Sequence, residues 1–299
     1  MNHREPANLP FDILAFGHFL PKQVHVHLDP SPRPTTPQLE ALIAEEWDRQ
    51  IALAKHHGRE LFNGSLMRYV DHAVTLDHAV NQQTTTASPN SPRRQPAGSD
   101  LHLTVGPTCY RDFVGTNLFN HHRIEAFGWH RFANPIGTTA TLTTRDGRIC
   151  YGRRSARVAY HALHVHTFGG GLEASDRSPD GTIDPFASLC RELAEELNLA
   201  RDELGDLLCV GLIRDKEIRQ PEMLFEADLD LTADQLIGRW KSAQSRDEHD
   251  EIVTLSDTPE AIVPFIRHCG PIAPVAIGAL FLHGRRRWGR RWFEDAAAE

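Results

Sequence analysis

The segment from His166 to Leu199 constrains the fold more than any other part of the chain. Its second half predicts a helix, because Asp184 is a good N-cap and Pro185 suits the first helical position. Apolar residues then recur at three- and four-residue spacing, namely Phe186, Leu189, Leu193 and Leu197. One stripe of this helix is therefore expected to lie in a hydrophobic core.

Three carboxylates project beside that apolar stripe. At about 100° per residue, Glu192, Glu195 and Glu196 fall on one face of the predicted helix. Taken alone, such a face is most often solvated. However, the glycine run 169–171 follows a segment predicted to be extended, residues 160–168, and it lets the backbone bend closely around a ligand. Clustered carboxylates suit Mg²⁺ or Mn²⁺, which favour hard oxygen ligands.

Together these features resemble the signature of the Nudix hydrolases, which cleave nucleoside diphosphates linked to another group. The family pattern is a Gly-Gly loop, a Glu, and then Arg-Glu-Leu-x-Glu-Glu-x-Gly-Leu, and residues 191–197 match it in full. Asn198 replaces the closing Gly, which is an acceptable change because Asn also adopts the left-handed helix cap. The intermediate Glu is at best Asp176, with residues 177–182 inserted as a surface loop.

A second run, Tyr110 to Asn117, resembles the Nudix subgroup that hydrolyses UDP-glucose and UDP-galactose. Its sequence is Tyr-Arg-Asp-Phe-Val-Gly-Thr-Asn. Trp47 and the Leu-Phe-Asn-Gly motif at 61–64 fall where that subgroup has a helix Trp followed by Leu-Phe-Asp/Asn. Without this context, the run would be interpreted as a structured turn with a local Arg–Asp pair.

The resemblance implies an α/β fold in two parts. Residues 132–299 would form a Nudix α/β/α sandwich with a mixed β-sheet, and residues 1–131 a smaller α+β domain. A hairpin is expected at Thr139–Thr144 and Arg148–Arg153, around an Asp-Gly turn. The Thr/Ser/Pro-rich stretch 84–99 predicts an exposed, flexible loop.

The resemblance also implies roles for the signature residues. Glu195 and Glu196 would be the principal metal ligands, and the Gly169 carbonyl would complete the shell. Glu192 would bind a further ion or take a proton from the attacking water.

Other residues would support this site. Arg191 would be structural, pairing with a carboxylate to fix the helix against the loop, and Gly170 would be structural as well. Glu222 on a later strand would add a metal ligand, although an ordinary edge-strand Glu fits almost equally well. The candidate substrate-binding residues are Tyr110, Arg111, Asp112, Asn117 and Arg214.

The predicted reaction is Mg²⁺-dependent hydrolysis (Mn²⁺ being the other candidate ion) of UDP-glucose or UDP-galactose to UMP and a sugar 1-phosphate. Two alternatives stay open: another nucleoside diphosphate derivative such as ADP-ribose, or a non-catalytic nucleotide-sensing module. A His-x-x-His-x-His run at 161–166 invites a metal interpretation. A strand would place His164 and His166 on one face and His161 on the other, so a three-His site is not expected.

Composition limits the other function classes. A net charge of −8 argues against general nucleic-acid binding. Five scattered cysteines without a Cys-x-x-Cys pair fit a reduced cytoplasm and oppose a structural zinc site. The N-terminus lacks a signal-type apolar core, and the longest apolar run, 272–282, contains Pro274 and is too short to span a bilayer. We therefore expect a cytoplasmic protein that acts on a small molecule and binds neither nucleic acid nor a membrane.

The sequence leaves two points open. It does not indicate an oligomeric state. The basic, aromatic tail at 285–292 is interpreted as a solvated helix end, with contact to an anion as the alternative.

Overall fold

A computed structural model describes residues 9–76, 98–158 and 160–299. The predicted flexible loop at 84–99 lies outside the described residues, apart from Gly98 and Ser99. Ser99 already belongs to a strand, because β4 spans Ser99–Cys109.

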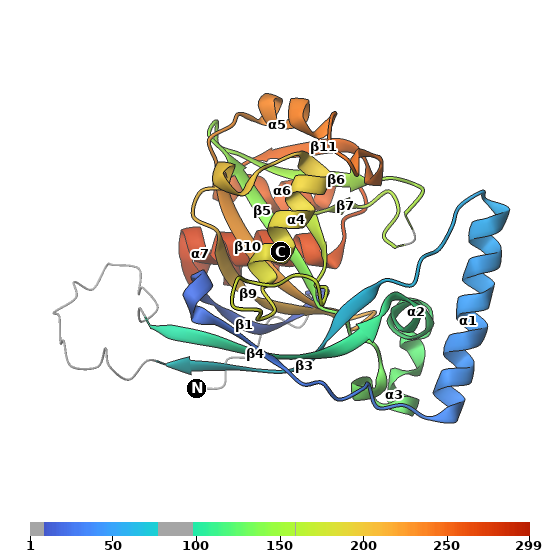
Figure 1. Ribbon diagram of the computed structural model, residues 1–299. Coiled ribbons are helices and arrows are strands. Elements are labelled where there is room, and N and C mark those ends of the chain that lie inside the picture. The colour runs from blue at the N-terminus through green and yellow to red at the C-terminus, as the bar shows by residue number, and fades with distance from the viewer. Residues whose placement is uncertain (1–8, 77–97, 159) are drawn as a thin grey trace.

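An eight-stranded mixed sheet forms the centre of the molecule (Figure 1). Its strand order is β1-β9-β10-β5-β6-β11, while β7 pairs with β6 and β8 pairs with β5. Strands β10 and β5 are parallel, and the other pairs are antiparallel. The strands are β1 (Phe11–Phe19), β5 (Gly137–Thr144), β6 (Arg148–Arg154), β7 (Val165–His166), β8 (Phe168–Gly171), β9 (Leu208–Asp215), β10 (Pro221–Leu229) and β11 (His249–Ser256).

Helices cover both faces of this sheet. Helix α4 (Pro185–Leu197) lies in front of it in Figure 1, and α7 (Pro274–Ala298) lies behind. Strand β10 shows how the two layers alternate: Phe225 packs on Phe186 of α4, with ring centroids 5.0 Å apart, whereas Leu224 joins the hydrophobic cluster that contains α7. Two further helices, α5 (Ala233–Trp240) and α6 (Pro259–His268), complete this part. The predicted α/β/α sandwich with a mixed sheet is confirmed.

The signature helix has the predicted ends. The Asp184 side chain accepts hydrogen bonds from the N–H groups of Phe186 (2.9 Å) and Ala187 (3.3 Å), as an N-cap does. At the other end Asn198 has φ 55°, the left-handed cap that its replacement of Gly predicted.

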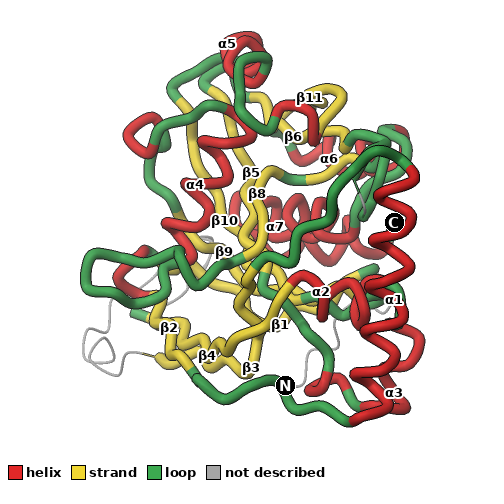
Figure 2. The backbone as a smooth tube through the Cα atoms, turned by 45° about the vertical axis from the view of Figure 1, so that its right-hand side comes forward, coloured by secondary structure: helices red, strands yellow, loops and turns green. Residues whose placement is uncertain are grey.

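A second, three-stranded sheet has the order β2-β4-β3 and packs against the sandwich (Figure 2). Its inner face carries Leu101, Leu103 and Val105, which lie in the same core as Phe168 and Leu193. The elements of this region are β2 (Val24–Leu28), α1 (Pro37–His56), β3 (Ser65–Leu76), α2 (Tyr110–Phe113), η3 (Val114–Leu118), η4 (His121–Arg123), α3 (Ile124–Phe127) and η5 (Trp129–Arg131).

The two regions share a strand. Strand β1 comes from the N-terminal segment, yet it pairs antiparallel with β9 at the edge of the large sheet. The division of the chain after residue 131 stays a prediction, but β1 does not follow it.

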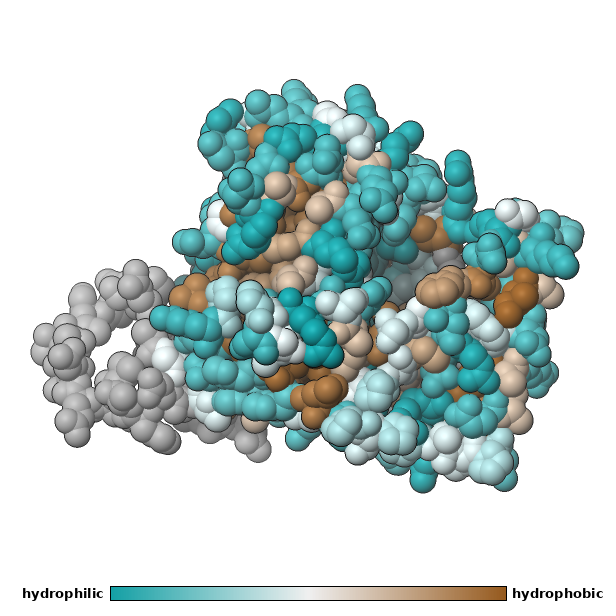
Figure 3. Space-filling view, in the orientation of Figure 1, coloured by the Kyte–Doolittle hydropathy of each residue, from teal (hydrophilic) through white to brown (hydrophobic). Residues whose placement is uncertain are grey.

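Two expectations about strands were wrong. Residues 160–167 are not one strand: only Val165–His166 is extended, because His161 and Leu163 have positive φ and the chain turns there. The glycine run is itself part of β8 rather than a bend. Among the described helices, none combines the length and the apolar character needed to cross a membrane, and the face in Figure 3 is largely hydrophilic.

Candidate active site

The glycines of β8 let the carboxylates of α4 approach the sheet. A Cβ atom on Gly170 would lie 2.3 Å from Oε1 of Glu192, so any side chain there would displace that carboxylate. The Gly169 N–H donates a hydrogen bond to Oε2 of Glu196 at 2.9 Å. Gly169 also has φ 141°, which a residue with a side chain rarely adopts. The glycine run therefore acts by leaving space for Glu192 and Glu196.

Arg191 is fixed between the insertion loop and the helix. Its Nε donates to Oδ1 of Asp176 at 2.9 Å and its Nη2 to Oδ2 at 3.2 Å. Its Nη1 donates to Oε1 of Glu192 at 2.7 Å. A two-point guanidinium–carboxylate pair has a fixed geometry, so Asp176 and Arg191 together orient the Glu192 side chain.

Burial outweighs the positive charge beside the acidic side chains of α4. Burial raises the pKa of Glu192 to about 7 and that of Glu196 well above its ordinary value. Repulsion from Glu248, in the short helix η7 (Arg246–Glu248), adds to both shifts. Burial also raises the pKa of Glu248 itself. A divalent cation would relieve this repulsion, so the donor set fits one.

The third signature carboxylate is more open. The Glu195 side chain is 36% exposed and lies 3.9 Å from Nη1 of Arg191. Among the described residues, the oxygens of Glu192, Glu195 and Glu196 do not all lie within 4.8 Å of one another. Carboxylates that repel one another without a cation are expected to spread in this way.

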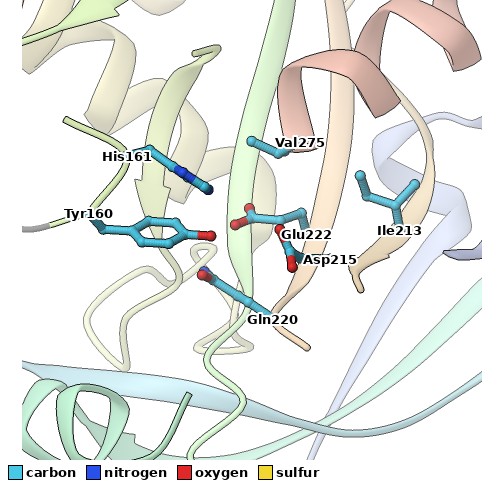
Figure 4. Close-up of a pocket in the computed structure, with 7 residues that line it drawn as sticks. All are labelled: Tyr160, His161, Ile213, Asp215, Gln220, Glu222 and Val275. Carbon is cyan, nitrogen blue, oxygen red and sulfur yellow. The ribbon is translucent and has the colours of Figure 1, made fainter. Parts of the chain in front are cut away.

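Glu222 comes from β10 and lies opposite another glycine. Gly137 is its partner on β5, and a Cβ there would lie 1.7 Å from Oε2 of Glu222. Burial raises the pKa of Glu222 to about 8, with a further contribution from Asp215. Figure 4 shows the Tyr160 hydroxyl directed towards these two carboxylates.

A cleft of about 170 Å³ opens beside Glu222. Its wall brings together the N-terminal region and the sandwich, with lining residues Tyr110, Phe113, Leu118, Arg154, Tyr160, His166, Gln220 and Glu222. Arg154 lies at the end of β6, and its charge offsets part of the rise that burial causes in the pKa of Glu196, Glu222 and Glu248. It makes no direct ion pair with any described residue, and its Nε donates to the Tyr160 carbonyl at 3.1 Å. Arg154 is thus a cation shared by the acidic groups.

The predicted substrate-binding residues separate into two groups. Tyr110 lines the cleft, and its ring meets Trp47 edge-on with centroids 6.2 Å apart. Arg111 and Asp112 form ion pairs with each other and with α1 and the segment before it: Arg111 also pairs with Glu40 and Asp112 with Arg33.

The structure does not bring Asn117 or Arg214 to the cleft. Asn117 is fully buried, and its Nδ2 donates to Asn134 Oδ1 at 2.9 Å and to the Ile218 carbonyl at 2.8 Å. Arg214 pairs with Asp12 at 2.8 Å and stacks on the Trp129 ring.

The three histidines at 161–166 lie together, contrary to the strand-based expectation. The His161 ring centroid is 5.1 Å from that of His164 and 6.2 Å from that of His166. Burial lowers the pKa of His161 to about 3 and that of His166 well below the ordinary value, so both are neutral. Nδ1 of His166 donates to the Thr167 carbonyl at 2.8 Å, which leaves Nε2 as an acceptor.

Sequence reasoning missed Arg154, Tyr160 and Glu248. Arg154 is the last residue of β6, one residue beyond the predicted strand Arg148–Arg153. Extending that strand by one residue would have included it. Glu248 and Tyr160 lie in irregular segments, where no periodicity indicates which way a side chain points.

Known proteins share parts of this chain. Uridine diphosphate glucose pyrophosphatase NUDT22 of Homo sapiens is 30% identical over 139 residues, which cover 40% of this chain and 46% of that protein. The chain therefore matches less than half the length of the human protein. Nudix hydrolase 9 of Arabidopsis thaliana is 25% identical over 272 residues, 79% of each chain. No protein-family model matches.

Among solved structures, DR0079 from Deinococcus radiodurans overlays 49% of this chain and 80% of its own, at 17% identity and a TM-score of 0.37. That overlay is too loose for any residue correspondence. The signature on α4 and the glycines opposite it agree with the likeness to these two Nudix hydrolases.

Proposed function

We propose that the protein is a divalent-metal-dependent Nudix hydrolase that cleaves the pyrophosphate bond of a nucleotide sugar. The substrate in this proposal is UDP-glucose or UDP-galactose, and the products are UMP and the sugar 1-phosphate. The observation that carries the proposal is the placement of Glu192 and Glu196 of α4 directly against the glycines of β8. The likeness to the human UDP-glucose pyrophosphatase supports the choice of substrate.

The proposed metal ligands are Glu192, Glu195 and Glu196, with Glu222 and the Gly169 carbonyl as further donors. Bound Mg²⁺ supplies charge neutralisation and a water of lowered pKa. The buried carboxylates fit that cation because burial and mutual repulsion keep the pKa values of Glu192 and Glu196 raised despite Arg191 and Arg154 nearby. Mn²⁺ suits the same oxygen ligands.

The chain's own residues have three tasks in this proposal. Asp176 and Arg191 hold the Glu192 side chain in a fixed orientation. Glu192 would either bind a further ion or accept a proton from the attacking water. Arg154 faces the cleft and would bind the substrate phosphates, since a guanidinium matches phosphate oxygens well.

Aromatic side chains close the cleft on the N-terminal side. Tyr110 and Phe113 of this region, with Tyr160 of the sandwich opposite, offer flat apolar surface for a nucleoside base or a sugar ring. The N-terminal region would thus contribute to substrate binding. The five cysteines are free thiols, in keeping with a cytoplasmic setting.

The test is incubation of the purified protein with UDP-glucose and Mg²⁺, with UMP and glucose 1-phosphate measured by chromatography. We expect product release that Glu196→Gln reduces by at least about 10³-fold, because the charge facing Gly169 is lost. Glu45→Gln, at an exposed position of α1, is the matched control and should leave the rate unchanged. Absence of UMP, or equal rates for wild type and Glu196→Gln, would refute the proposal.

A panel of nucleoside diphosphate derivatives decides the leaving group. The acidic helix carries no information about the base, so ADP-ribose and other nucleotide sugars belong in the panel. Turnover of ADP-ribose alone would keep the hydrolase and change its substrate. A thermal shift with UDP-glucose but no turnover of any substrate would instead identify a nucleotide-sensing module.

A further inference from the structure

Four polar side chains gather on the outer face of the three-stranded sheet, on elements separate from α4 and β8. His25 and His27 alternate along β2, and His25 lies beside His102 of β4 in the register of this parallel pair. Asp100 lies two residues before His102, so it projects from the same face. The opposite face carries the buried Leu101 and Leu103.

The nitrogen and oxygen atoms of this group are close together. Nε2 of His25 is 3.1 Å from Oδ2 of Asp100, and Nε2 of His27 is 3.3 Å from Nδ1 of His102. The rings of His25 and His102 are stacked, with centroids 4.8 Å apart. One ligand atom each from His25, Asp100 and His102 lies within 4.8 Å of the other two.

We propose that His25, Asp100 and His102, with His27 as a fourth ligand, bind one divalent transition-metal ion of the zinc class. Zn²⁺ takes four ligands in a tetrahedron with bonds of about 2.0–2.1 Å, which sets the ligand atoms roughly 3.3 Å apart. The separations of 3.1 and 3.3 Å already have this value. His27 is not part of that group of three, so its side chain would rotate to reach the same ion.

The surroundings prepare His102 for this role. Its Nε2 lies 3.3 Å from the Thr75 hydroxyl on the neighbouring strand β3. When Nε2 carries the proton and donates a hydrogen bond to this hydroxyl, Nδ1 is unprotonated. Nδ1 then faces His27 with a free lone pair, as metal ligation requires. The side chains of His25 and Asp100 are 40% and 39% exposed, so an ion reaches them from solvent.

The donor set selects a different ion from the carboxylates of α4. Imidazole nitrogens favour Zn²⁺, Ni²⁺ and Cu²⁺, whereas Mg²⁺ prefers oxygen ligands. The ion would join β2 to β4, and His25 and Asp100 are 75 residues apart in the chain. Its effect is therefore stabilisation of the short edge strand β2 rather than chemistry on a substrate.

The experiment is calorimetric titration of the full chain with Zn²⁺ in excess Mg²⁺, followed by metal analysis after gel filtration. We expect one equivalent of Zn²⁺ in the wild type, in the Glu196→Gln variant and in the control His268→Ala, which removes an exposed histidine of α6. His25→Ala and His102→Ala should each weaken Zn²⁺ binding by at least about 10-fold. Zn²⁺ should raise the thermal midpoint of the wild type but not of these two variants.

Asp100→Asn is a second variant that keeps the shape of the side chain, and circular dichroism establishes that each variant is folded. Should an alanine variant not fold, Asp100→Asn carries the comparison. Equal Zn²⁺ affinity in the wild type and the folded variants, or no bound Zn²⁺ in the wild type, would overturn the proposal. Loss of the Zn²⁺ in Glu196→Gln would also overturn it by assigning the ion to α4. None of these outcomes depends on hydrolysis of a nucleotide sugar.

Discussion

Two glutamates on one strand behave in opposite ways. Glu222 and Glu226 are four residues apart on β10, so they project from the same face of the sheet. Burial raises the pKa of Glu222 to about 8, yet the pKa of Glu226 is lowered to about 2 despite its burial. The difference must come from their neighbours.

Cations from α7 surround Glu226. His283 lies 3.3 Å from Oε2 of Glu226 through Nδ1, and Arg286 forms an ion pair with the same oxygen. His283 Nε2 is also 2.8 Å from Asp257, which pairs with Arg287 at 2.8 Å. At the other end of the strand, Glu222 has Asp215 beside it and only the shared charge of Arg154.

The comparison indicates which buried acidic residues of the sandwich are available to bind a ligand cation. Buried charges are costly unless they are paired. The sandwich pairs the acids beneath α7 with its own arginines and leaves the acids near the cleft short of positive charge. A ligand cation would complete the second group, while the first needs none.

Removing the charge of Glu226 should have the largest effect on stability. Glu226→Gln leaves His283 and Arg286 without their anion, which costs about 3–5 kcal/mol for a buried pair. Since the folded pKa is about 2 and the ordinary value 4.5, the loss should be complete above about pH 4.5 and shrink as the pH falls towards 2. Urea denaturation at several pH values measures this. A loss that is independent of pH would contradict the pairing.

Removing the shared cation should come next. Arg154→Gln should reduce kcat/KM for UDP-glucose about 100-fold, mainly through KM, because a phosphate-binding charge is lost. Arg145→Gln is the control, since Arg145 pairs with Asp230 at the surface of the hairpin turn. An unchanged KM in Arg154→Gln would remove this residue from the phosphate site.

Neutralising Glu222 should stabilise the metal-free protein. Its folded pKa of about 8 exceeds the ordinary 4.5, so the folded state binds the extra proton and stability falls as the pH rises between these values. Glu222→Gln should cancel that fall, so the variant should be more stable than the wild type at pH 8. Denaturant titration at pH 5 and pH 8, with EDTA present, measures both. The same dependence of unfolding free energy on pH in wild type and variant would show that the pKa of Glu222 is not raised in the folded protein.

Adding the ion should have the smallest effect on stability. Mg²⁺ at about ten times its dissociation constant should stabilise the wild type by about 1.4 kcal/mol, or roughly 2–4 °C in Tm. Glu196→Gln should reduce this shift, whereas Glu226→Gln should keep it. An equal rise in Tm with Mg²⁺ in the wild type and Glu196→Gln would show that the ion does not bind the acids of α4, so the two acidic groups would not differ in this way.

Local patterns in the sequence predicted the helices and strands, but not always which side of a strand a given side chain occupies. The signature helix and its caps at Asp184 and Asn198 followed from short-range rules, and so did the hairpin around Asp146-Gly147. Arg214 shows the limit. It is adjacent to Asp215, and neighbouring strand residues point to opposite sides, so only the packed sheet shows that Asp215, not Arg214, lies beside Glu222 and Tyr160 (Figure 4).

Irregular segments and long-range partners were also beyond local patterns. The turn at His161 and Leu163 depends on left-handed backbone conformations, and neither position has the glycine that would have predicted them. The basic tail was interpreted as a solvated helix end. Instead Arg286 and Arg287 contact acids of β10 and the β11–α6 connection, so the alternative of an anionic contact is met within the chain itself.

The edge position of β1 has a consequence for biosynthesis. Its partner β9 leaves the ribosome roughly 190 residues later, which at 5–20 residues per second is a delay of about 10–40 s. During that interval β1 has an unpaired edge and uncovered apolar side chains, including Phe11 and Phe19, which lie in two different cores of the folded protein. The nascent chain is therefore expected to need shielding by a chaperone, and a truncation that deletes β1 would leave β9 open to pairing with other molecules.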